Sequence, residues 1–248
     1  MTVDKTLERG QKPVFIFKNH RTSFYYWCKA RKEFGISGSF FVVTMDHHND
    51  LFPLLPEKIA EIQALDLNNL VKVEKFVKNK LKKLNDDYVF AAMEAGLIGD
   101  ILIMSSETRD ITEYIDSASV KHKIFHCFWP GDLSGPRGFL TDSIPNRNSE
   151  LITSIGYDKN GNPNIVLDID LDFFTYYYCD NTYVVDKENF KDIFSEDSLI
   201  WWIYDKARLI TIAKEPWGCG GAQNSKRILK LLKKYFLKSQ SNDREPWA

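Results

Sequence analysis

Short apolar runs, separated by segments with helical spacing, constrain the fold of this chain more than any other feature. The clearest run is IVLDIDLDFF (165–174), and PVFIF (13–17), SFFVVTMD (39–46) and RLITIAK (208–214) have the same character. Runs that are apolar at nearly every position are typical of parallel strands buried on both faces. Helices must then cover both sides of the sheet. The sequence therefore predicts an α/β fold, a three-layer α/β/α arrangement with a mainly parallel sheet.

The segments between these runs have the spacing of amphipathic helices. Residues 21–35 predict one helix, and residues 57–85 carry apolar side chains at helical spacing, with Val73, Phe76, Val77, Leu81 and Leu84 on one face. Two more strands are expected at 100–104 and 123–129. A basic amphipathic helix is predicted at about 225–238, packed on the sheet with its lysines in water, with a membrane surface as the alternative partner. Because no linker or repeat is visible, the 248 residues are expected to form a single domain.

Composition excludes several classes of function. A net charge of −1 argues against a general nucleic-acid binder. No apolar run approaches the ~20 residues that span a bilayer, and the charged N-terminus has no signal-peptide core. Four widely spaced cysteines indicate reduced thiols and therefore a cytoplasmic protein. Together with the charge and the absence of a long apolar run, this leads us to expect no nucleic-acid and no membrane partner. The Gly- and Pro-rich segment 131–150 predicts a long functional loop. The sequence does not determine the oligomeric state.

Two predicted strands end in acidic or imidazole side chains at alternate positions. These residues are Asp46, His48 and Asp50 in the first strand, and Asp168, Asp170 and Asp172 in the second. Residues two apart in a strand point to the same side, and ligand sites of parallel sheets lie at the carboxyl ends of the strands. Burying a bare carboxylate costs several kcal/mol, and neither group has a Lys or Arg nearby in sequence. Divalent cations are therefore the expected partners.

His20 stands in the corresponding place after the first predicted strand and before the first helix. By itself it would be explained as a structural or surface histidine. A lone DxHxD could be a solvated turn, and a lone DxDxD could be a calcium loop or a phosphatase nucleophile. Three such segments at one rim of a sheet favour a metal site, because their burial would otherwise cost too much.

The order of these segments resembles the arginase and ureohydrolase superfamily. The motifs of that family are Gly-Gly-Asp-His, Asp-Ala-His-x-Asp and Ser-x-Asp-x-Asp. They are similar to KNHRT (18–22), DHHND (46–50) and DIDLD (168–172), although the glycines before the first histidine are absent. The resemblance covers about residues 13–216, and LDIDLDFF and ITIAKEPWG look most like the peptide arginases. It implies an arginase-like fold, two Mn²⁺ ions, and conversion of arginine to ornithine in a ribosomally made precursor peptide.

Carried across residue by residue, the resemblance implies a set of metal ligands. These are His20, Asp46, His48, Asp50, Asp170 and Asp172. Alignment with the third motif puts Asp168 at the serine position, next to the metal ligands. A shift by two would instead make Asp168 and Asp170 the ligands, and strand alternation does not separate these options. Carboxylates and imidazoles together suit Mn²⁺ better than an ion that seeks thiolates.

The implied reaction is attack of a metal-bridging hydroxide on the guanidinium carbon, which gives urea and ornithine. Asp50 is implied as the residue that accepts a proton and passes it to the leaving amine. Glu215, after the last strand, matches the carboxylate that binds the guanidinium group. No histidine follows Asp50 closely as a proton shuttle, so His126 or His47 takes this role, or the proton comes from solvent or Asp50. Trp217 is expected to contact the peptide or simply to pack.

Other functions remain compatible with the same residues. A metal-dependent deacetylase of the same fold would use one zinc ion and fewer carboxylates, and an amidinohydrolase would act on a small molecule. A phosphatase motif normally opens the fold, whereas LDIDLD begins only at residue 167. A non-catalytic module would bind metal without turnover. The sequence does not specify the precursor peptide, the arginines that are modified, or the need for a leader segment.

Overall fold

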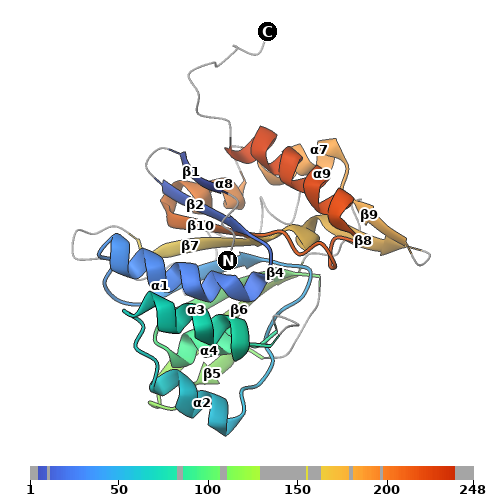
Figure 1. The fold of residues 1–248 in the computed structure, drawn as a ribbon. Coiled ribbons are helices and arrows are strands. Elements are labelled where there is room, and N and C mark those ends of the chain that lie inside the picture. The colour runs from blue at the N-terminus through green and yellow to red at the C-terminus, as the bar shows by residue number, and fades with distance from the viewer. Residues whose placement is uncertain are drawn as a thin grey trace.

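The computed structural model describes residues 5–9, 12–82, 86–106, 111–128, 155, 163–178, 181–195 and 198–237, which form an α/β fold (Figure 1). The main sheet has eight strands. In spatial order they are β1 (Lys5–Arg9), β2 (Lys12–Phe17), β10 (Ala207–Ala213), β7 (Ile165–Asp170), β3 (Phe40–Met45), β4 (Ile98–Ser105), β6 (Lys121–Phe128) and β5 (Glu113–Ile115). The strands from β2 to β6 in this order are parallel, and β1 and β5 are antiparallel edges. The predicted α/β class and mainly parallel sheet are therefore confirmed.

Side chains of the inner strands alternate between two hydrophobic cores. Val43 and Leu167 belong to one core, and their neighbours Val42 and Val166 belong to the other. The first core is covered by α7 (Lys187–Ile193), α8 (Leu199–Lys206) and α9 (Ala222–Leu232). The second is covered by α1 (Ser23–Glu33), α2 (Pro56–Gln63), α3 (Leu70–Asn79) and α4 (Tyr88–Glu94). Figure 1 shows the two groups of helices on opposite sides of the sheet, as the apolar character of the strands requires.

The segment 57–85, which has helical spacing in the sequence, does not form one continuous helix. The chain forms α2 and α3 instead, and the side chain of Asn69 caps α3 by accepting a hydrogen bond of 3.2 Å from the backbone N–H of Lys72. An asparagine at the N-cap stabilises the start of a helix, so α3 begins directly after Asn69. The sequence also did not reveal α4, because its residues 88–93 are all buried and show no polar face.

The C-terminal helix packs as expected. Ile228 and Leu232 of α9 and Phe236 of the following π-turn (Lys233–Leu237) are buried in the core shared with α7 and α8. The apolar face of the helix is thus already covered by protein, which does not favour the alternative of a membrane surface. None of the helices in the described ranges is long and apolar enough to cross a bilayer. The predicted loop at 131–150 lies outside the described residues.

Candidate metal centre

Four neighbouring parallel strands bring the candidate residues to one rim of the sheet. In spatial order the strands are β2, β10, β7 and β3. Asp170 is the last residue of β7, Asp46 directly follows β3, Glu215 lies two residues after β10, and His20 begins a 3₁₀ turn (His20–Thr22) after β2. Because the strands are parallel, these carboxyl ends meet at the same edge, as the sequence predicts.

A turn, and not an extended strand, brings Asp46 and Asp50 together. Strand β3 ends at Met45, and Oδ1 of Asp46 accepts a hydrogen bond of 2.8 Å from the backbone N–H of His48. Asp50 has a φ of 49°, in the left-handed region that Asp tolerates better than most residues. The predicted alternation through residue 50 is therefore wrong, although the convergence that it predicted for Asp46 and Asp50 is present.

The second acidic segment is built in the same way. Asp168 and Asp170 lie on β7, but Asp172 lies in a 3₁₀ turn (Leu171–Phe174), where its N–H donates to Oδ1 of Asp170 at 3.1 Å. The backbone N–H of His47 donates to Oδ1 of Asp172 at 3.2 Å and so links the two turns. In each segment, an aspartate side chain closes the turn that positions the next acidic residue.

Among the residues that the structure describes, two groups of buried side chains have the proximity needed for a metal ion. In each group, one candidate ligand atom per residue lies within 4.8 Å of the others. The first group is His20, Asp46 and Asp50, and the second is Asp46, Asp170 and Asp172. Nδ1 of His20 lies 2.9 Å from Oδ2 of Asp46, 3.2 Å from Oδ2 of Asp50 and 3.3 Å from Oδ2 of Asp170. This cluster could hold a metal ion, and Asp46 is common to both groups.

The charges of the cluster are balanced poorly without a cation. Burial and the charge of Asp46 raise the pKa of Asp50 well above its usual value, and burial and Asp172 do the same to the pKa of Asp170. Burial and Asp46 raise the pKa of Asp172 to about 8. Burial acts against the charged form of Asp46 as well, but the attraction of His20 outweighs it and lowers this pKa. A hard divalent cation would favour the ionised form of all four carboxylates.

Asp168 lies on the other side of the His20 ring. Its Oδ2 lies 2.7 Å from Nε2 of His20, and its side chain accepts hydrogen bonds from the hydroxyls of Ser23 at 2.8 Å, Thr211 at 2.5 Å and Tyr88 at 3.2 Å. Such a carboxylate orients a histidine and keeps its other nitrogen available to a metal. The geometry thus favours Asp168 as the residue beside the ligands, with Asp170 and Asp172 in the candidate metal group.

The groups around Asp168 were mostly not found by sequence reasoning. Tyr88 lies on a helix that has no amphipathic pattern, so nothing in the sequence connects it with His20. Thr211 had a weak signal, because it is a polar residue in the otherwise apolar run LITIA and is fully buried. Buried polar groups need hydrogen-bond partners, and here the partner is a carboxylate from the neighbouring strand.

A cavity of about 570 Å³ opens above the cluster. Glu215 lines it and accepts a hydrogen bond of 2.6 Å at Oε1 from the backbone N–H of His20. Burial is the main cause of a raised pKa of Glu215. Trp217 stands at the cavity and is 91% exposed. The side chain of His48 also lines the cavity but is 49% exposed, and its Nε2 lies 3.9 Å from Oδ2 of Asp172.

His47 and His126 were the histidines considered for proton transfer. Neither is among the described residues that line this cavity. His126 lies on β6, two strands from β3, and its Nε2 donates to the carbonyl oxygen of Ile111 at 2.6 Å. His47 points to Ser106, with 3.1 Å between Nδ1 and Oγ. The structure therefore does not bring His126 to the other site residues, because its strand lies too far along the sheet.

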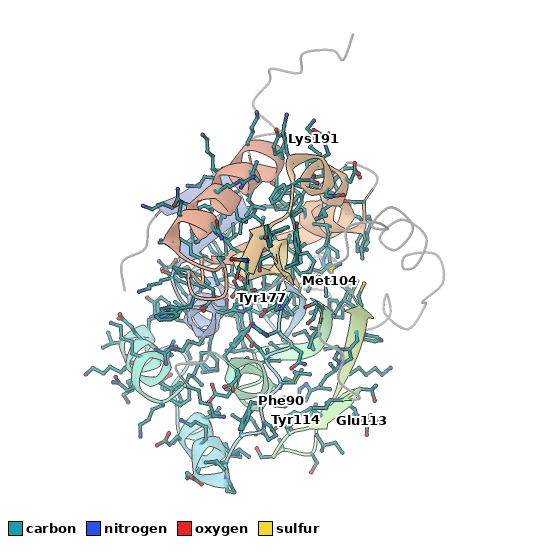
Figure 2. All side chains as sticks on the ribbon, turned by 90° about the vertical axis from the view of Figure 1, so that its right-hand side faces the viewer. Phe90, Met104, Glu113, Tyr114, Tyr177 and Lys191 are labelled. Atoms are coloured by element: carbon teal, nitrogen blue, oxygen red, sulfur yellow. The ribbon has the colours of Figure 1, made fainter. Side chains whose placement is uncertain are left out.

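Tyr177 of β8 (Thr175–Tyr178), which pairs with β9 (Asn181–Val184), packs edge-on against His47 and is labelled in Figure 2.

Gly218 is expected to be essential for the position of Asp172. A Cβ atom at Gly218 would lie 2.2 Å from Oδ2 of Asp172 and 2.9 Å from its Cβ. Gly218→Ala should therefore displace this carboxylate and weaken metal binding about tenfold or more, with about 1–3 kcal/mol lost from the stability of the metal-free fold. Calorimetric titration with Mn²⁺ measures the first effect. An unchanged affinity would show that Asp172 is not a ligand.

The metal-free chain is expected to lose stability as the pH rises from about 4 to about 8. The pKa of Asp172 is about 8 in the folded chain and about 3.9 when unfolded, so the folded state binds this proton more tightly. The raised pKa values of Asp50 and Asp170 act in the same direction. Thermal unfolding in a chelator, measured between pH 5 and pH 8, tests this. Mn²⁺ should remove the trend because it replaces the protons, and a melting temperature that rises with pH in chelator would contradict it.

Comparison of the sequence with models of known protein families and with curated proteins gives no match. The chemistry of the site must accordingly be inferred from its own donor atoms, charges and cavity.

Proposed function

We propose that this chain is a manganese-dependent hydrolase that converts arginine side chains of a ribosomally made peptide to ornithine and releases urea. The observation that best supports this is the pair of buried donor groups that share Asp46 below a cavity lined by Glu215. The cluster supplies ligands for metal ions, and the glutamate supplies a counter-charge for a cationic substrate. The order of the three motifs, which resembles the ureohydrolases, suggests the guanidinium group as that cation.

The donors fit Mn²⁺ in kind and in charge. His20, Asp46 and Asp50 would hold one ion, and Asp46, Asp170 and Asp172 would hold a second, with His48 at the exposed side of the second group. Carboxylate oxygens with one or two imidazoles suit Mn²⁺, and bound cations would favour the ionised forms of Asp50, Asp170 and Asp172, whose pKa values burial raises. When bound, the ions supply hydroxide at neutral pH by lowering the pKa of water from about 15.7 toward about 7.

The residues of the chain would bind the substrate and move protons. Glu215 would accept hydrogen bonds from the guanidinium group. It would thereby hold the guanidinium carbon next to the two groups of candidate metal ligands. Asp50, beside Nδ1 of His20, would take a proton from the attacking water and give it to the amine that leaves. Water adds to the guanidinium carbon, the bond from this carbon to the side-chain nitrogen breaks, and the side chain leaves as the ornithine ammonium. Asp168, Tyr88, Ser23 and Thr211 would keep His20 in place.

A peptide, and not free arginine, is the substrate that the open side of the cavity supports. Trp217 is 91% exposed at the cavity, and Tyr177, 57% exposed, donates a long hydrogen bond of 3.4 Å to the carbonyl oxygen of Gly218 next to it. Large exposed aromatic side chains beside a site are typical of surfaces that bind peptides. Their faces can also attract the cationic side chains of an arginine-rich peptide.

The proposal predicts urea release from arginine-containing peptides incubated with the Mn²⁺-loaded chain. Each modified arginine should lose roughly 42 Da, the mass of CN₂H₂, by hydrolysis at the metal site. Mass spectrometry of the peptides and a colorimetric urea assay measure this, and free arginine should be a much poorer substrate. Efficient turnover of free arginine would contradict the peptide assignment. Two Mn²⁺ per chain without any turnover would instead support a non-catalytic module, and one Zn²⁺ with amide hydrolysis would support a deacetylase.

A further inference from the structure

A second cavity lies beside the cavity above the metal ligands, which we call the metal cavity. The proposed reaction does not use this second cavity. Its volume is about 240 Å³, and its walls include Lys18, Asn19, Arg21, Thr22, Val77 and Lys78. Lys18, Asn19 and Arg21 also line the metal cavity. The short segment between β2 and α1 therefore forms a wall common to both cavities, and His20 within this segment reaches the metal groups. We call the smaller cavity the side cavity.

The two cavities differ in the balance of their charges. The metal cavity is lined by five acidic residues, which outnumber the two cations, Lys18 and Arg21, that it shares with the side cavity: Asp46, Asp50, Asp170, Asp172 and Glu215. Within the described part of the chain, no acidic side chain lines the side cavity, and three cationic ones do: Lys18, Arg21 and Lys78.

The three cations are balanced only in part by acidic residues outside the side cavity. Lys78 pairs with Glu74 at 2.7 Å. Arg21 donates to the carbonyl oxygen of Leu81 at 2.7 Å and lies in the field of Asp87 and Glu215. Lys18 is exposed and has no ion-pair partner among the described residues. The side cavity therefore keeps an excess of positive charge.

The base of the side cavity also favours an anion. Thr22 is only 6% exposed, stands at the N-terminus of α1, and its side chain makes no capping hydrogen bond. The N-terminus of a helix of this length carries a partial positive charge, although the N–H of Ser23, the first residue of α1, already donates to the carbonyl oxygen of His20. Cavity, cations and helix end thus point to the same kind of ligand.

We propose that the side cavity binds a carboxylate of the substrate while the metal cavity holds the guanidinium group. The guanidinium half of this inference rests on the proposed function. Because the cavities adjoin and share three lining residues, Lys18, Asn19 and Arg21, both groups would belong to one substrate molecule. The chain would thus select arginines that lie next to an acidic residue or that carry a free α-carboxylate. These are the two sources of a carboxylate near an arginine in a peptide.

Three acetylated tripeptides test this inference. The first has a central arginine with Glu beside it and an amidated C-terminus, the second has Gln in place of the Glu, and the third has two alanines followed by a C-terminal arginine with a free α-carboxylate. With the full Mn²⁺-loaded chain at low ionic strength, we expect the KM of the Glu peptide to be about fivefold lower than that of the Gln peptide. The preference should shrink at high salt because the cations are partly exposed.

Variants show whether the side cavity causes the preference. Lys18→Gln and Lys78→Gln should each bring the KM values for Glu and Gln peptides closer together. Lys75→Gln, on the same helix as Lys78 but outside both cavities, should leave the ratio unchanged. A preference only for the peptide with a free C-terminus would support the side cavity and identify the α-carboxylate as its ligand. Equal KM values for all three peptides, or a Glu preference that Lys18→Gln and Lys78→Gln both leave intact, would overturn the inference.

Failure of the proposed function would be recognised separately. If none of the peptides releases urea, the hydrolase proposal fails, and the same peptides can be titrated into the Mn²⁺-loaded chain by calorimetry. Tighter binding of the Glu peptide that is lost in Lys18→Gln would still support the side cavity as a carboxylate site. Identical affinities for Glu and Gln peptides would reject it.

Discussion

Replacing Asp170 by asparagine is expected to abolish metal binding by the second group and urea release while making the metal-free chain more stable. Asp170 lies 3.3 Å from Nδ1 of His20 and belongs to the second metal group, so the change removes a charged ligand from the cluster. Affinity for Mn²⁺ should fall by more than about 100-fold, the upper end of what residues beside metal ligands contribute. Without metal, a neutral amide relieves the burial and repulsion that raise the pKa of this carboxyl well above normal.

Thermal unfolding separates these two effects. At Mn²⁺ concentrations of 100 times Kd, the wild-type chain should gain about 2.7 kcal/mol, or about 5–10 °C in melting temperature. Asp170→Asn should show little of this gain, yet melt at a higher temperature than the wild-type chain in chelator. Asp205→Asn, at an exposed position on α8, is the matched control and should behave like the wild-type chain. If Asp170→Asn kept its metal content and activity, the ligand set would be wrong.

Replacing Glu215 by glutamine is expected to reduce kcat/KM about 100-fold or more and to leave the metal content unchanged. Glu215 lines the cavity, but it belongs to neither of the two metal groups. Loss of one partner from a buried pair of charges costs about 2–5 kcal/mol, which corresponds to a factor of about 30 to several thousand. The hydrogen bond from the His20 N–H can be kept by the amide oxygen, so the loop should hold its shape.

Metal analysis and kinetics together test the role of Glu215. The variant should bind as much Mn²⁺ as the wild-type chain and lose activity toward arginine peptides. Glu57→Gln, an exposed glutamate in the first turn of α2, serves as the control. Loss of Mn²⁺ in Glu215→Gln would show a role in metal binding, and unchanged kinetics would show that another group binds the guanidinium.

The sheet could be predicted well from the sequence because its inner strands are apolar on both faces. The runs at 13–17, 39–46, 165–174 and 208–214 all contain strands, and the polar residues that follow them lie at one rim. Helices were less well predicted. A capping asparagine divides the segment 57–85, and α4 is buried on all sides, so neither boundary depends on amphipathic spacing.

The sequence predicts most residues of the candidate site but not the backbone geometry that brings them together. Asp46 and Asp50 come together through a turn with a positive φ at Asp50, not through the alternation of a strand. The structure does not bring His126 to the other candidate residues, since β4 separates its strand from β3. The side cavity could not be anticipated at all, because Lys18 and Lys78 come from separate elements that only packing brings together.

By itself, the sequence determined that strands of a buried sheet carry His20, the aspartates and Glu215 to one rim, because apolar runs and the residues that end them are local features. Only the tertiary structure decided that Asp168 faces the far side of the His20 ring with Tyr88, Ser23 and Thr211, while Asp170 and Asp172 join Asp46. The physical reason is that hydrogen-bond partners are chosen by the packing of distant elements. Alternation along one strand gives Asp168 and Asp170 the same direction and cannot distinguish them.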